Sequence, residues 1–421
     1  MTAGKVAGKV YVVGAGLAGL SAAVALAGKG VAVELSEATG QAGGRCRSYF
    51  DAQLDLTIDN GNHLVLSGNQ AVMRYLRTIG AQDRLAGPDR AEFTFVDLRS
   101  NDRWVLRPNE GPLAWWIFDA DRRVPGTKPQ DYLGLAGMML PQPGKRVDQV
   151  LTAGGVLWDR LLDPFLLAAL NTDAASGSAD LAGAIVRETL AKGGRAYRPR
   201  IAEPTLAAAF IEPALKLLDR HASSRVRLNH RLRSLEFDGA RVVGLNVGGE
   251  TIAVAQGDQV ILAVPPWIAQ TLVPGVKAPD EFRAIVNGHF RVAPPPGAAP
   301  IVGVIGGTAQ WVFAFPDRIS TTISGADHFM DVDREVLIGQ LWRDVCAVHG
   351  LSGPVPPWQI VKERRATFAA TPQQAAKRAK AVTQWSNLFL AGDWTDTGLP
   401  ATIEGALRSG ETAAALALKA R

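Results

Sequence analysis

A glycine-rich turn near the start of the chain restricts the fold more than any other feature. Gly14, Gly16 and Gly19 have the spacing G-x-G-x-x-G, between the β-branched run Val10–Val13 and the small-residue run Leu20–Ala27. In a strand–turn–helix unit the first glycine permits a tight turn, the second lets the backbone approach a pyrophosphate, and the third lets helix and strand pack closely. The apolar run VAVEL that follows completes a βαβ unit of about 30 residues. The pattern predicts an α/β protein with a Rossmann-like dinucleotide-binding domain.

The same turn is expected to form a phosphate site, because a helix N-terminus presents free N–H groups and a positive dipole end to an anion. Glu37 lies 18 residues after Gly19, where an acid accepts hydrogen bonds from ribose hydroxyls. Glu34 is the alternative acid, but it lies inside the expected strand and should point the other way. An acid here disfavours NADP and leaves NAD or FAD. The turn contacts are expected from Gly14, Ala15, Gly16, Leu17, Ala18 and Gly19.

Residues 10–28 have a second interpretation, since they form an uncharged apolar stretch of nearly membrane-spanning length. Four glycines at patterned spacing make this stretch a poor lipid-embedded helix and a good strand–turn–helix. The opening residues, MTAGKVAGKV, lack the apolar core of a signal peptide. We therefore expect neither a membrane span nor a secretory leader at this end.

Size and charge narrow the remaining options. A chain of 421 residues is expected to form two or three domains. The formal net charge is +5, without a long Lys/Arg run or a nucleic-acid motif. This balance fits ordinary solubility or a basic face for an anionic lipid, cofactor or substrate, and argues against nucleic acid. Cys46 and Cys346 are the only cysteines, and the six histidines lack metal-ligand spacing, so we expect a reducing, cytoplasmic compartment and no metal.

The character of the sequence changes twice along the chain. Short strands give way to Leu-rich helices after residue 85, and the strand-rich style returns at 210, with Asp238-Gly239 as a hairpin turn. The many prolines of residues 274–300 predict loop and edge structure. The helices are expected over residues 156–170, 181–192, 211–221 and 401–418. The predicted dinucleotide-binding domain comprises residues 1–85, 210–275 and 360–421, and a substrate-binding domain of mixed sheet and helices comprises 86–209 and 276–359.

Gly43-Gly44-Arg45, six residues after Glu37, indicates which dinucleotide fits. Here the sequence resembles the flavoprotein family of amine oxidases and phytoene desaturases, in which this block contacts the FAD phosphates. Three further blocks are similar to the family: Asp59–His63 (DNGNH) beside the isoalloxazine ring, Leu228–Leu235 near the adenine, and Leu388–Gly410 around the flavin. The resemblance implies FAD contacts from Gly43, Gly44, Arg45, Asn60, Gly61, Leu232, Gly392, Asp393, Thr402 and Ile403. The N–H groups of the last two would face flavin N1 and O2, where a helix N-terminus stabilises negative charge.

The segment Trp158–Leu181 narrows the family further. It resembles the squalene-associated FAD-dependent desaturases, now interpreted as hydroxysqualene dehydroxylases of bacterial squalene and hopanoid synthesis. The resemblance implies reductive removal of a hydroxyl from hydroxysqualene to give squalene, with squalene-pathway enzymes as partners. Asn62 departs from the pattern, because relatives often carry glutamine there.

Hydroxide is a poor leaving group, so the implied reaction needs a proton donor as well as a hydride from reduced flavin. His63 and Asp396 are the candidate acids, and a backbone-bonded histidine and a loop or cap residue are the respective alternatives. An apolar, aromatic-lined pocket would suit a cation-like carbon. Each candidate aromatic has core packing as its alternative role; they are Trp104, Trp115, Trp116, Phe118, Trp158, Phe165, Trp311, Phe313 and Phe315.

Three other functions remain open. A carotenoid or phytoene-type desaturase or isomerase could use the same scaffold. A flavin amine oxidase usually places two aromatic residues around the amine, and Trp385 or Trp394 would have to replace the missing C-terminal tyrosine. A non-catalytic lipid carrier would bind no flavin.

A hydrophobic substrate also suggests peripheral attachment to the inner face of the cell membrane. The candidate surface is Leu113–Phe118 (LAWWIF), beside Arg122-Arg123. A buried strand with a solvated arginine pair is the alternative for this segment.

Overall fold

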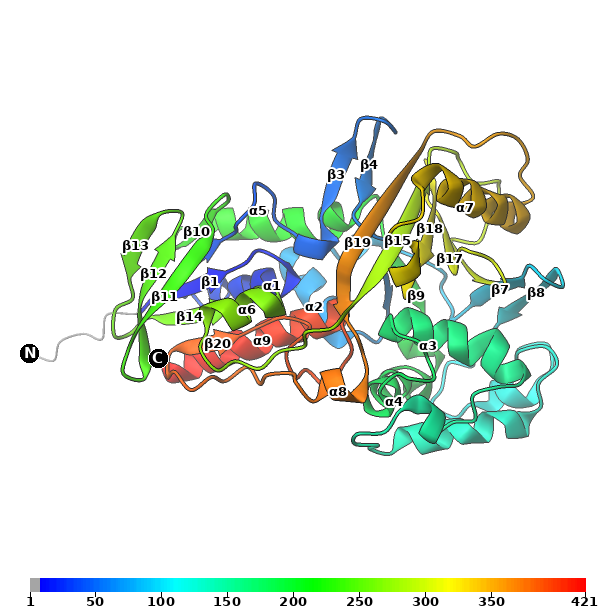
Figure 1. The fold of residues 1–421 in the computed structure, drawn as a ribbon, viewed down its shortest axis with the longest axis horizontal. Helices are drawn as coiled ribbons and strands as arrows, with labels where there is room; N and C mark the ends of the chain where they lie inside the picture. The colour runs from blue at the N-terminus through cyan, green and yellow to red at the C-terminus, as the bar shows by residue number, and fades with distance from the viewer. Residues whose placement is uncertain (1–7) are drawn as a thin grey trace, which may run out of the picture.

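The computed structural model describes residues 8–421, so the expectation about a signal peptide at the first seven residues lies outside the described part. At one end of the molecule lies a five-stranded parallel sheet (Figure 1). Its strands come from the start, the middle and the end of the chain. In sheet order they are β10 (Ser224–Arg227), β2 (Val33–Ser36), β1 (Val10–Val13), β14 (Gln259–Leu262) and β20 (Leu388–Leu390).

Two helices from opposite ends of the sequence pack against each other beside this sheet. They are α1 (Leu17–Ala27) and α9 (Ile403–Ala420). A Cβ atom on Gly410 of α9 would lie 2.2 Å from the carbonyl oxygen of Ala18, so only glycine permits this close approach. The expected strand–turn–helix is therefore present where a membrane span was the alternative. Among residues 8–421, no helix combines the length and apolarity needed to cross a bilayer.

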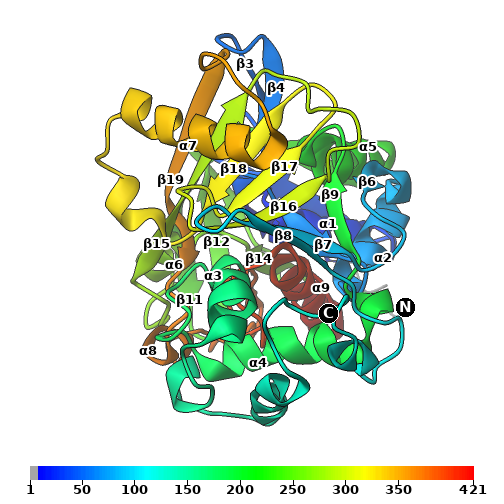
Figure 2. The ribbon, with the colours of Figure 1, turned by 90° about the vertical axis from the view of Figure 1, so that its right-hand side faces the viewer.

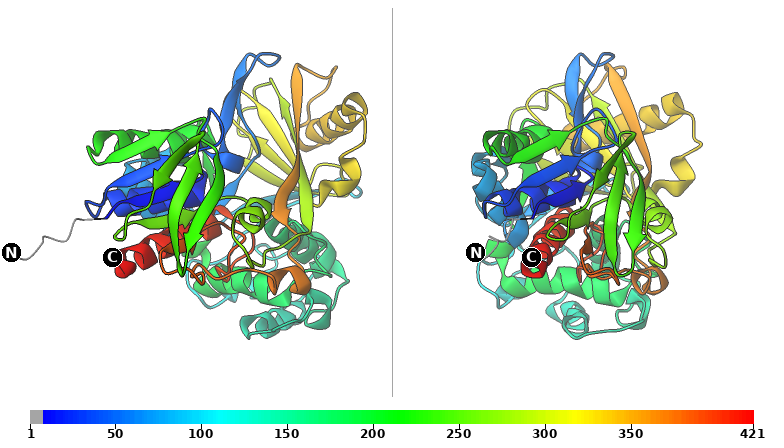
Figure 3. Two further views of the ribbon diagram at one scale, coloured as in Figure 1. Left: turned by 60° about the vertical axis from the view of Figure 1, so that its left-hand side comes forward. Right: turned by 90° about the vertical axis from the view of Figure 1, so that its left-hand side faces the viewer.

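A three-stranded antiparallel sheet lies beside the first (Figure 3). It consists of β11 (Leu232–Asp238), β12 (Arg241–Val247) and β13 (Glu250–Ala253). Asp238 pairs with Arg241, and Gly239 has a φ of +55°, so the Asp-Gly turn predicted from the sequence is confirmed.

The second large sheet has seven strands and carries α7 (Arg334–His349) on one face (Figure 2). Apolar side chains of that helix, including Leu337 and Leu341, form a core with the facing strand residues. The strand order is β19 (Trp358–Phe368), β15 (Phe282–Phe290), β18 (Ile319–Ile323), β17 (Trp311–Ala314), β16 (Ile301–Ile305), β7 (Phe93–Asp97) and β8 (Asp102–Leu106).

The prediction of loop and edge structure for residues 274–300 is wrong for its central part. Residues 282–290 form β15, which lies inside the sheet between β19 and β18. The prolines fall on either side, and residues 280–293 contain none, so every backbone N–H needed for pairing is present. Averaging proline content over the whole range concealed this strand.

The helices expected in the middle of the chain are present with shifted bounds. A π-helical turn, Trp158–Leu162, precedes α3 (Asp163–Leu170), and the Ser178 side chain caps α4 (Ala179–Glu188). The remaining elements that bear on the site are β3 (Ser48–Asp51), β4 (Leu56–Asp59), β5 (Leu64–Leu66), α2 (Gln70–Ile79), β6 (Leu85–Ala86), η3 (Trp115–Phe118), η4 (Pro129–Met139), β9 (Pro199–Ala202), α5 (Glu212–Arg220), α6 (Pro266–Leu272) and α8 (Pro372–Ala375). The expected α/β class, with a further part of mixed sheet and helices, is confirmed.

Candidate functional site

One large cavity, about 1050 Å³, lies where the two large sheets approach each other. Its wall includes the turn between β1 and α1, the start of α9, and one face of β15, β17, β18 and β19. Segments far apart in the sequence therefore contribute to a single chamber. Its volume is at the upper end of the range for small-molecule sites.

The turn after β1 forms a cradle at one end of this cavity. Gly14 has a φ of +101°, and a Cβ atom on it would lie 2.4 Å from the carbonyl oxygen of Ala263, so a side chain there would collide with backbone. Gly16 has ordinary dihedral angles, and no atom lies within 4 Å of the place where its Cβ would be. That open space beside a helix N-terminus is the room a pyrophosphate requires. Leu17 and Ala18 also line the cavity, whereas Ala15 and Gly19 support the turn from outside it.

Glu37 and Glu34, the two candidate acids of the glycine fingerprint, lie in different surroundings. Glu37 lines the cavity, and its carboxylate accepts hydrogen bonds from the N–H groups of Ala15 at 2.9 Å and Thr39 at 3.0 Å. Glu34 lies in β2, 3.1 Å from the Lys9 ammonium and 3.2 Å from Arg227 Nε. Of these two acids, Glu37 is therefore the one on the cavity wall.

The Gly43-Gly44-Arg45 block forms the adjoining wall. Gly43 donates its N–H to the carbonyl of Ala15, which fixes this block against the fingerprint turn. The Arg45 guanidinium lies 2.7 Å from the Asp393 carboxylate and 2.6 Å from the carbonyl oxygen of Ala366. Gly43, Gly44 and Arg45 all line the cavity, so this cationic side chain is available to a phosphate.

The C-terminal segment closes the same wall. Gly392, Asp393, Thr402 and Ile403 line the cavity, and α9 begins at Ile403. The Thr402 hydroxyl caps this helix by accepting the Gly405 N–H at 3.0 Å. The first N–H groups of α9 remain outside the helical hydrogen-bond pattern, as the family resemblance implied for the flavin edge.

The DNGNH segment is held by a buried ion pair between the end of β4 and Arg318, the residue before β18. Asp59 accepts hydrogen bonds from Ser48 Oγ at 2.5 Å and Leu206 N at 2.9 Å, and lies 3.7 Å from Arg318 Nη2. Burial raises the pKa of Asp59, against the opposing effect of these partners. Asn60 and Gly61 follow directly and line the cavity.

Leu232 also lines the cavity, at the start of β11. Three polar neighbours that sequence reasoning had not selected lie beside it: His230, Arg231 and Arg233. Their position next to the predicted adenine strand was the available signal.

The two candidate acids differ in placement. His63 lines the cavity, but desolvation and the nearby Arg45 guanidinium lower its pKa to about 4, so its ring is neutral near pH 7. A neutral imidazole does not suit the role of imidazolium proton donor expected for His63. Asp396 is exposed, is not part of the cavity wall, and donates its N–H to Ala379. The structure therefore brings His63, but not Asp396, to the site.

The end of the cavity away from the cradle is mainly apolar. Of the nine candidate aromatic residues, Phe165, Trp311 and Phe313 line it, while Trp104 and Trp116 are buried elsewhere. Trp394 also lines the cavity, with its Nε1 donating to the carbonyl of Val264. Other apolar lining residues are Phe93, Ala168, Ala169, Ile185, Trp267, Ile268, Leu272, Phe282, Ile285 and Phe368.

Sequence reasoning missed a set of polar residues in this apolar end. Asn287 and Thr322 line it from β15 and β18, and Glu363 lines it from β19. Asn62 reaches them, with its Nδ2 atom 3.1 Å from Thr322 Oγ1. Asn287 was missed because its strand was taken for a loop, and the proline-free stretch of residues 280–293 was the signal that could have revealed it.

The similarity of this chain to known proteins agrees with this geometry. A family model described as flavin containing amine oxidoreductase matches residues 17–418. The chain belongs to this family. The family is flavin-containing, so the expectation of FAD as cofactor is confirmed, and the chain is an FAD-dependent oxidoreductase.

The chain is also similar in sequence to individual proteins over almost its whole length. The chain is 55% identical over 412 residues to the hydroxysqualene dehydroxylase of Rhodopseudomonas palustris, covering 98% of each chain. It is 47% identical over 408 residues to the hydroxysqualene dehydroxylase of Zymomonas mobilis, covering 97% of this chain and 98% of the relative.

Solved structures share the fold at low sequence identity. Putrescine oxidase bound to putrescine has a TM-score of 0.68 at 16% identity, covering 98% of this chain and 99% of the other. Cyclohexylamine oxidase from Brevibacterium oxydans has a TM-score of 0.69 at 14% identity, with the same coverage. At this identity the likeness establishes the fold only.

Proposed function

We propose that this protein catalyses the reductive dehydroxylation of hydroxysqualene to squalene. The observation that carries the proposal is the single cavity with a dinucleotide cradle at one end and an apolar, aromatic wall at the other. Relatives named hydroxysqualene dehydroxylase, similar along nearly the whole chain, support this substrate class. The activity belongs to squalene and hopanoid biosynthesis, where enzymes that make and consume these isoprenoids would be its pathway partners.

FAD fits the residues that are present, and when bound and reduced it would supply a hydride to the substrate carbon. We propose that the fingerprint turn and Arg45 hold the pyrophosphate, that Glu37 holds the ribose, and that Leu232 lies at the adenine. Asp393 would bind a hydroxyl of the ribityl chain. The remaining FAD contacts are proposed for Gly14, Ala15, Gly16, Leu17, Ala18, Gly19, Gly43, Gly44, Asn60, Gly61, Gly392, Thr402 and Ile403.

The apolar wall would orient the hydrocarbon chain and exclude water from the reacting carbon. Trp311 and Phe313 line this wall, and aromatic rings suit an electron-poor carbon. Water exclusion matters because hydroxide or water near such a carbon would regenerate the alcohol. The polar side chains gathered around Asn62 are the groups that can meet the substrate hydroxyl.

The deciding experiment is an anaerobic single turnover. FAD-loaded protein is chemically reduced and mixed with hydroxysqualene, and flavin absorbance and product mass are followed. We expect flavin reoxidation together with one equivalent of squalene. If reduced enzyme does nothing while oxidised enzyme dehydrogenates squalene or phytoene, the protein is a desaturase. Purified protein that stays colourless after addition of FAD would indicate a lipid carrier.

We also propose that the chain divides into an FAD-binding domain, residues 1–85, 210–275 and 360–421, and a substrate-binding domain, residues 86–209 and 276–359. The two large sheets support this division, because all five parallel strands and α9 fall within the first set. Strand β19 crosses the proposed boundary at 360 and ends at Phe368.

A further proposal is peripheral attachment to the inner face of the cell membrane through η3. Leu113, Trp115 and Phe118 are 63%, 65% and 63% exposed, although such side chains are usually covered in soluble domains. The buried Trp116 anchors this turn by packing edge-on against Tyr132 of η4, at 5.3 Å between ring centroids.

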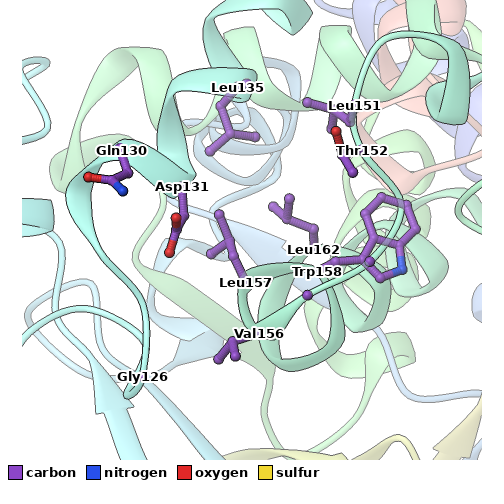
Figure 4. A pocket seen from close by; sticks show the side chains of 13 residues that line it. Gly126, Gln130, Asp131, Leu135, Leu151, Thr152, Val156, Leu157, Trp158 and Leu162 are labelled. Atoms are coloured by element: carbon purple, nitrogen blue, oxygen red, sulfur yellow. The ribbon is translucent and has the colours of Figure 1, made fainter.

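Other exposed apolar side chains lie in the segment that follows η3 in the sequence. They are Leu133, Leu140 and Val156. Val156 belongs to the wall of a second cavity of about 420 Å³, which Leu135 and Trp158 also line (Figure 4). A surface with this many exposed apolar side chains is more stable at the boundary between lipid headgroups and acyl chains than in water.

Replacing Trp115 and Phe118 by serine should lower the partition of the protein onto vesicles of phosphatidylcholine and phosphatidylglycerol by about tenfold or more, since each large apolar side chain contributes roughly 1.5–3 kcal/mol when fully buried. Co-sedimentation measures the effect. Val336→Ser is the control, because Val336 is equally exposed but lies on α7. Equal binding of both variants would refute this surface.

A further inference from the structure

A row of side chains crosses the cavity-facing side of the seven-stranded sheet. Glu363 on β19 lies opposite Ile285 on β15, and Asn287 on β15 lies opposite Thr322 on β18, which in turn lies opposite Trp311 on β17. Directly opposed residues in antiparallel strands project on the same face. All five line the cavity, so this face carries polar groups into its apolar end.

The DNGNH segment lies against this row. Asn60 Nδ2 is 3.4 Å from Glu363 Oε2, and Asn62 Nδ2 is 3.4 Å from Asn287 Oδ1. Asn60 and Gly61 belong to the segment proposed to flank the flavin ring. Glu363 is therefore placed where the cofactor end of the cavity meets the apolar end.

Glu363 differs from the other acids of the cavity wall. The amide of Asn60 is its one hydrogen-bond partner among residues 8–421, and no cationic side chain in that range lies within 4 Å of it. Every other acidic side chain of the wall has a structural partner: Glu37 binds backbone N–H groups, Asp393 binds Arg45, and Glu188 and Glu404 bind Arg408.

We propose that Glu363 is the proton donor to the departing hydroxyl, an inference that rests on the proposed function. Its carboxyl gives a proton to the hydroxyl oxygen, the C–O bond breaks with its electron pair on oxygen, and water leaves. Bound reduced flavin would supply the hydride that this carbon needs, so that the substrate would be reduced and the flavin oxidised. Glu363, left as a carboxylate, regains its proton from solvent.

The test is Glu363→Gln, which keeps size and hydrogen bonding but has no acidic proton. We expect unchanged flavin content and unchanged binding of hydroxysqualene to the oxidised enzyme, measured from the flavin spectrum. Single-turnover reoxidation by hydroxysqualene should slow by about 100- to 10,000-fold, the usual contribution of a general acid.

Glu335→Gln on the exposed first turn of α7 is the matched control and should keep the wild-type rate. A Glu363→Gln variant within about threefold of wild type would overturn the proposal. Failure of wild type itself to convert hydroxysqualene would be a failure of the proposed function, which separates the two results.

Discussion

Replacing Gly16 by valine is expected to leave a folded protein that no longer retains FAD. Gly16 has a φ of −73°, which valine adopts, and no protein atom lies within 4 Å of its Cβ position. The new side chain would therefore occupy only the cradle, where the pyrophosphate backbone must approach. We expect FAD affinity to fall by at least about 100-fold, or roughly 3 kcal/mol at 1.4 kcal/mol per tenfold change. The ratio of flavin to protein absorbance and a titration of apoprotein with FAD measure it.

Gly339→Val provides the matched control for this variant. Gly339 also has open space at its Cβ position, but it lies on α7, outside the cavity wall. It should retain full flavin, and circular dichroism should show both variants folded. Gly14→Val would not serve, because its Cβ would lie 2.4 Å from a backbone oxygen and the fold itself would suffer. Normal flavin content in the Gly16 variant would show that the pyrophosphate lies elsewhere.

Removing the Arg318 side chain is expected to lower the free energy of unfolding more than any other substitution named here. Arg318 is 2% exposed, with its guanidinium 3.9 Å from the Phe315 ring centroid and 3.7 Å from the Asp59 carboxylate. Arg318→Ala would leave Asp59 buried without its cation, which costs about 3–5 kcal/mol. Equilibrium denaturant unfolding near pH 7 measures the free energy. The ion pair also ties the DNGNH segment to β18, so FAD retention should weaken as well.

The control uses the other partner of the same arginine. Asp317 lies 2.9 Å from Arg318 Nη1 but is half exposed, so Asp317→Asn should cost about 1 kcal/mol or less. The pKa of Asp59 also determines how the stability deficit of Arg318→Ala changes with pH. Burial raises the pKa of Asp59, and without Arg318 it would rise further, so the folded variant binds a proton more readily than its unfolded chain. The deficit of Arg318→Ala should therefore shrink as pH falls toward 4. A deficit equal to that of Asp317→Asn would refute the ion pair's role.

The dinucleotide-binding end could be predicted from local sequence because its geometry is local. The G-x-G-x-x-G turn needs glycines at positions fixed by backbone conformation, and its acid follows within one βαβ unit. The structure accordingly places Gly16, Glu37 and Arg45 around one cavity. The choice of Glu37 over Glu34 followed from strand alternation alone, which is a short-range property.

The substrate end depends on long-range pairing, which the sequence expresses weakly. Asn287 and Glu363 share a cavity only because β15 pairs with β19, and the flanking prolines concealed β15. The charge state of His63 depends on desolvation and on Arg45, and neither can be read from residue type. Asp396 follows a cavity-lining segment directly, yet the chain turns it outward, which shows that closeness in sequence is a poor guide to placement in a loop.

The order of strands in the parallel sheet has a consequence for when the flavin site is completed during synthesis. β1 is next to β14, and β14 is next to β20, which with α9 is synthesised after every other strand of this sheet. A ribosome-bound chain that lacks residues 388–420 has the glycine turn but neither Asp393 nor the N-terminus of α9. Joining strands so distant in sequence is also a slow step in folding. Chains truncated before residue 388 are therefore expected to bind FAD more weakly than the whole chain.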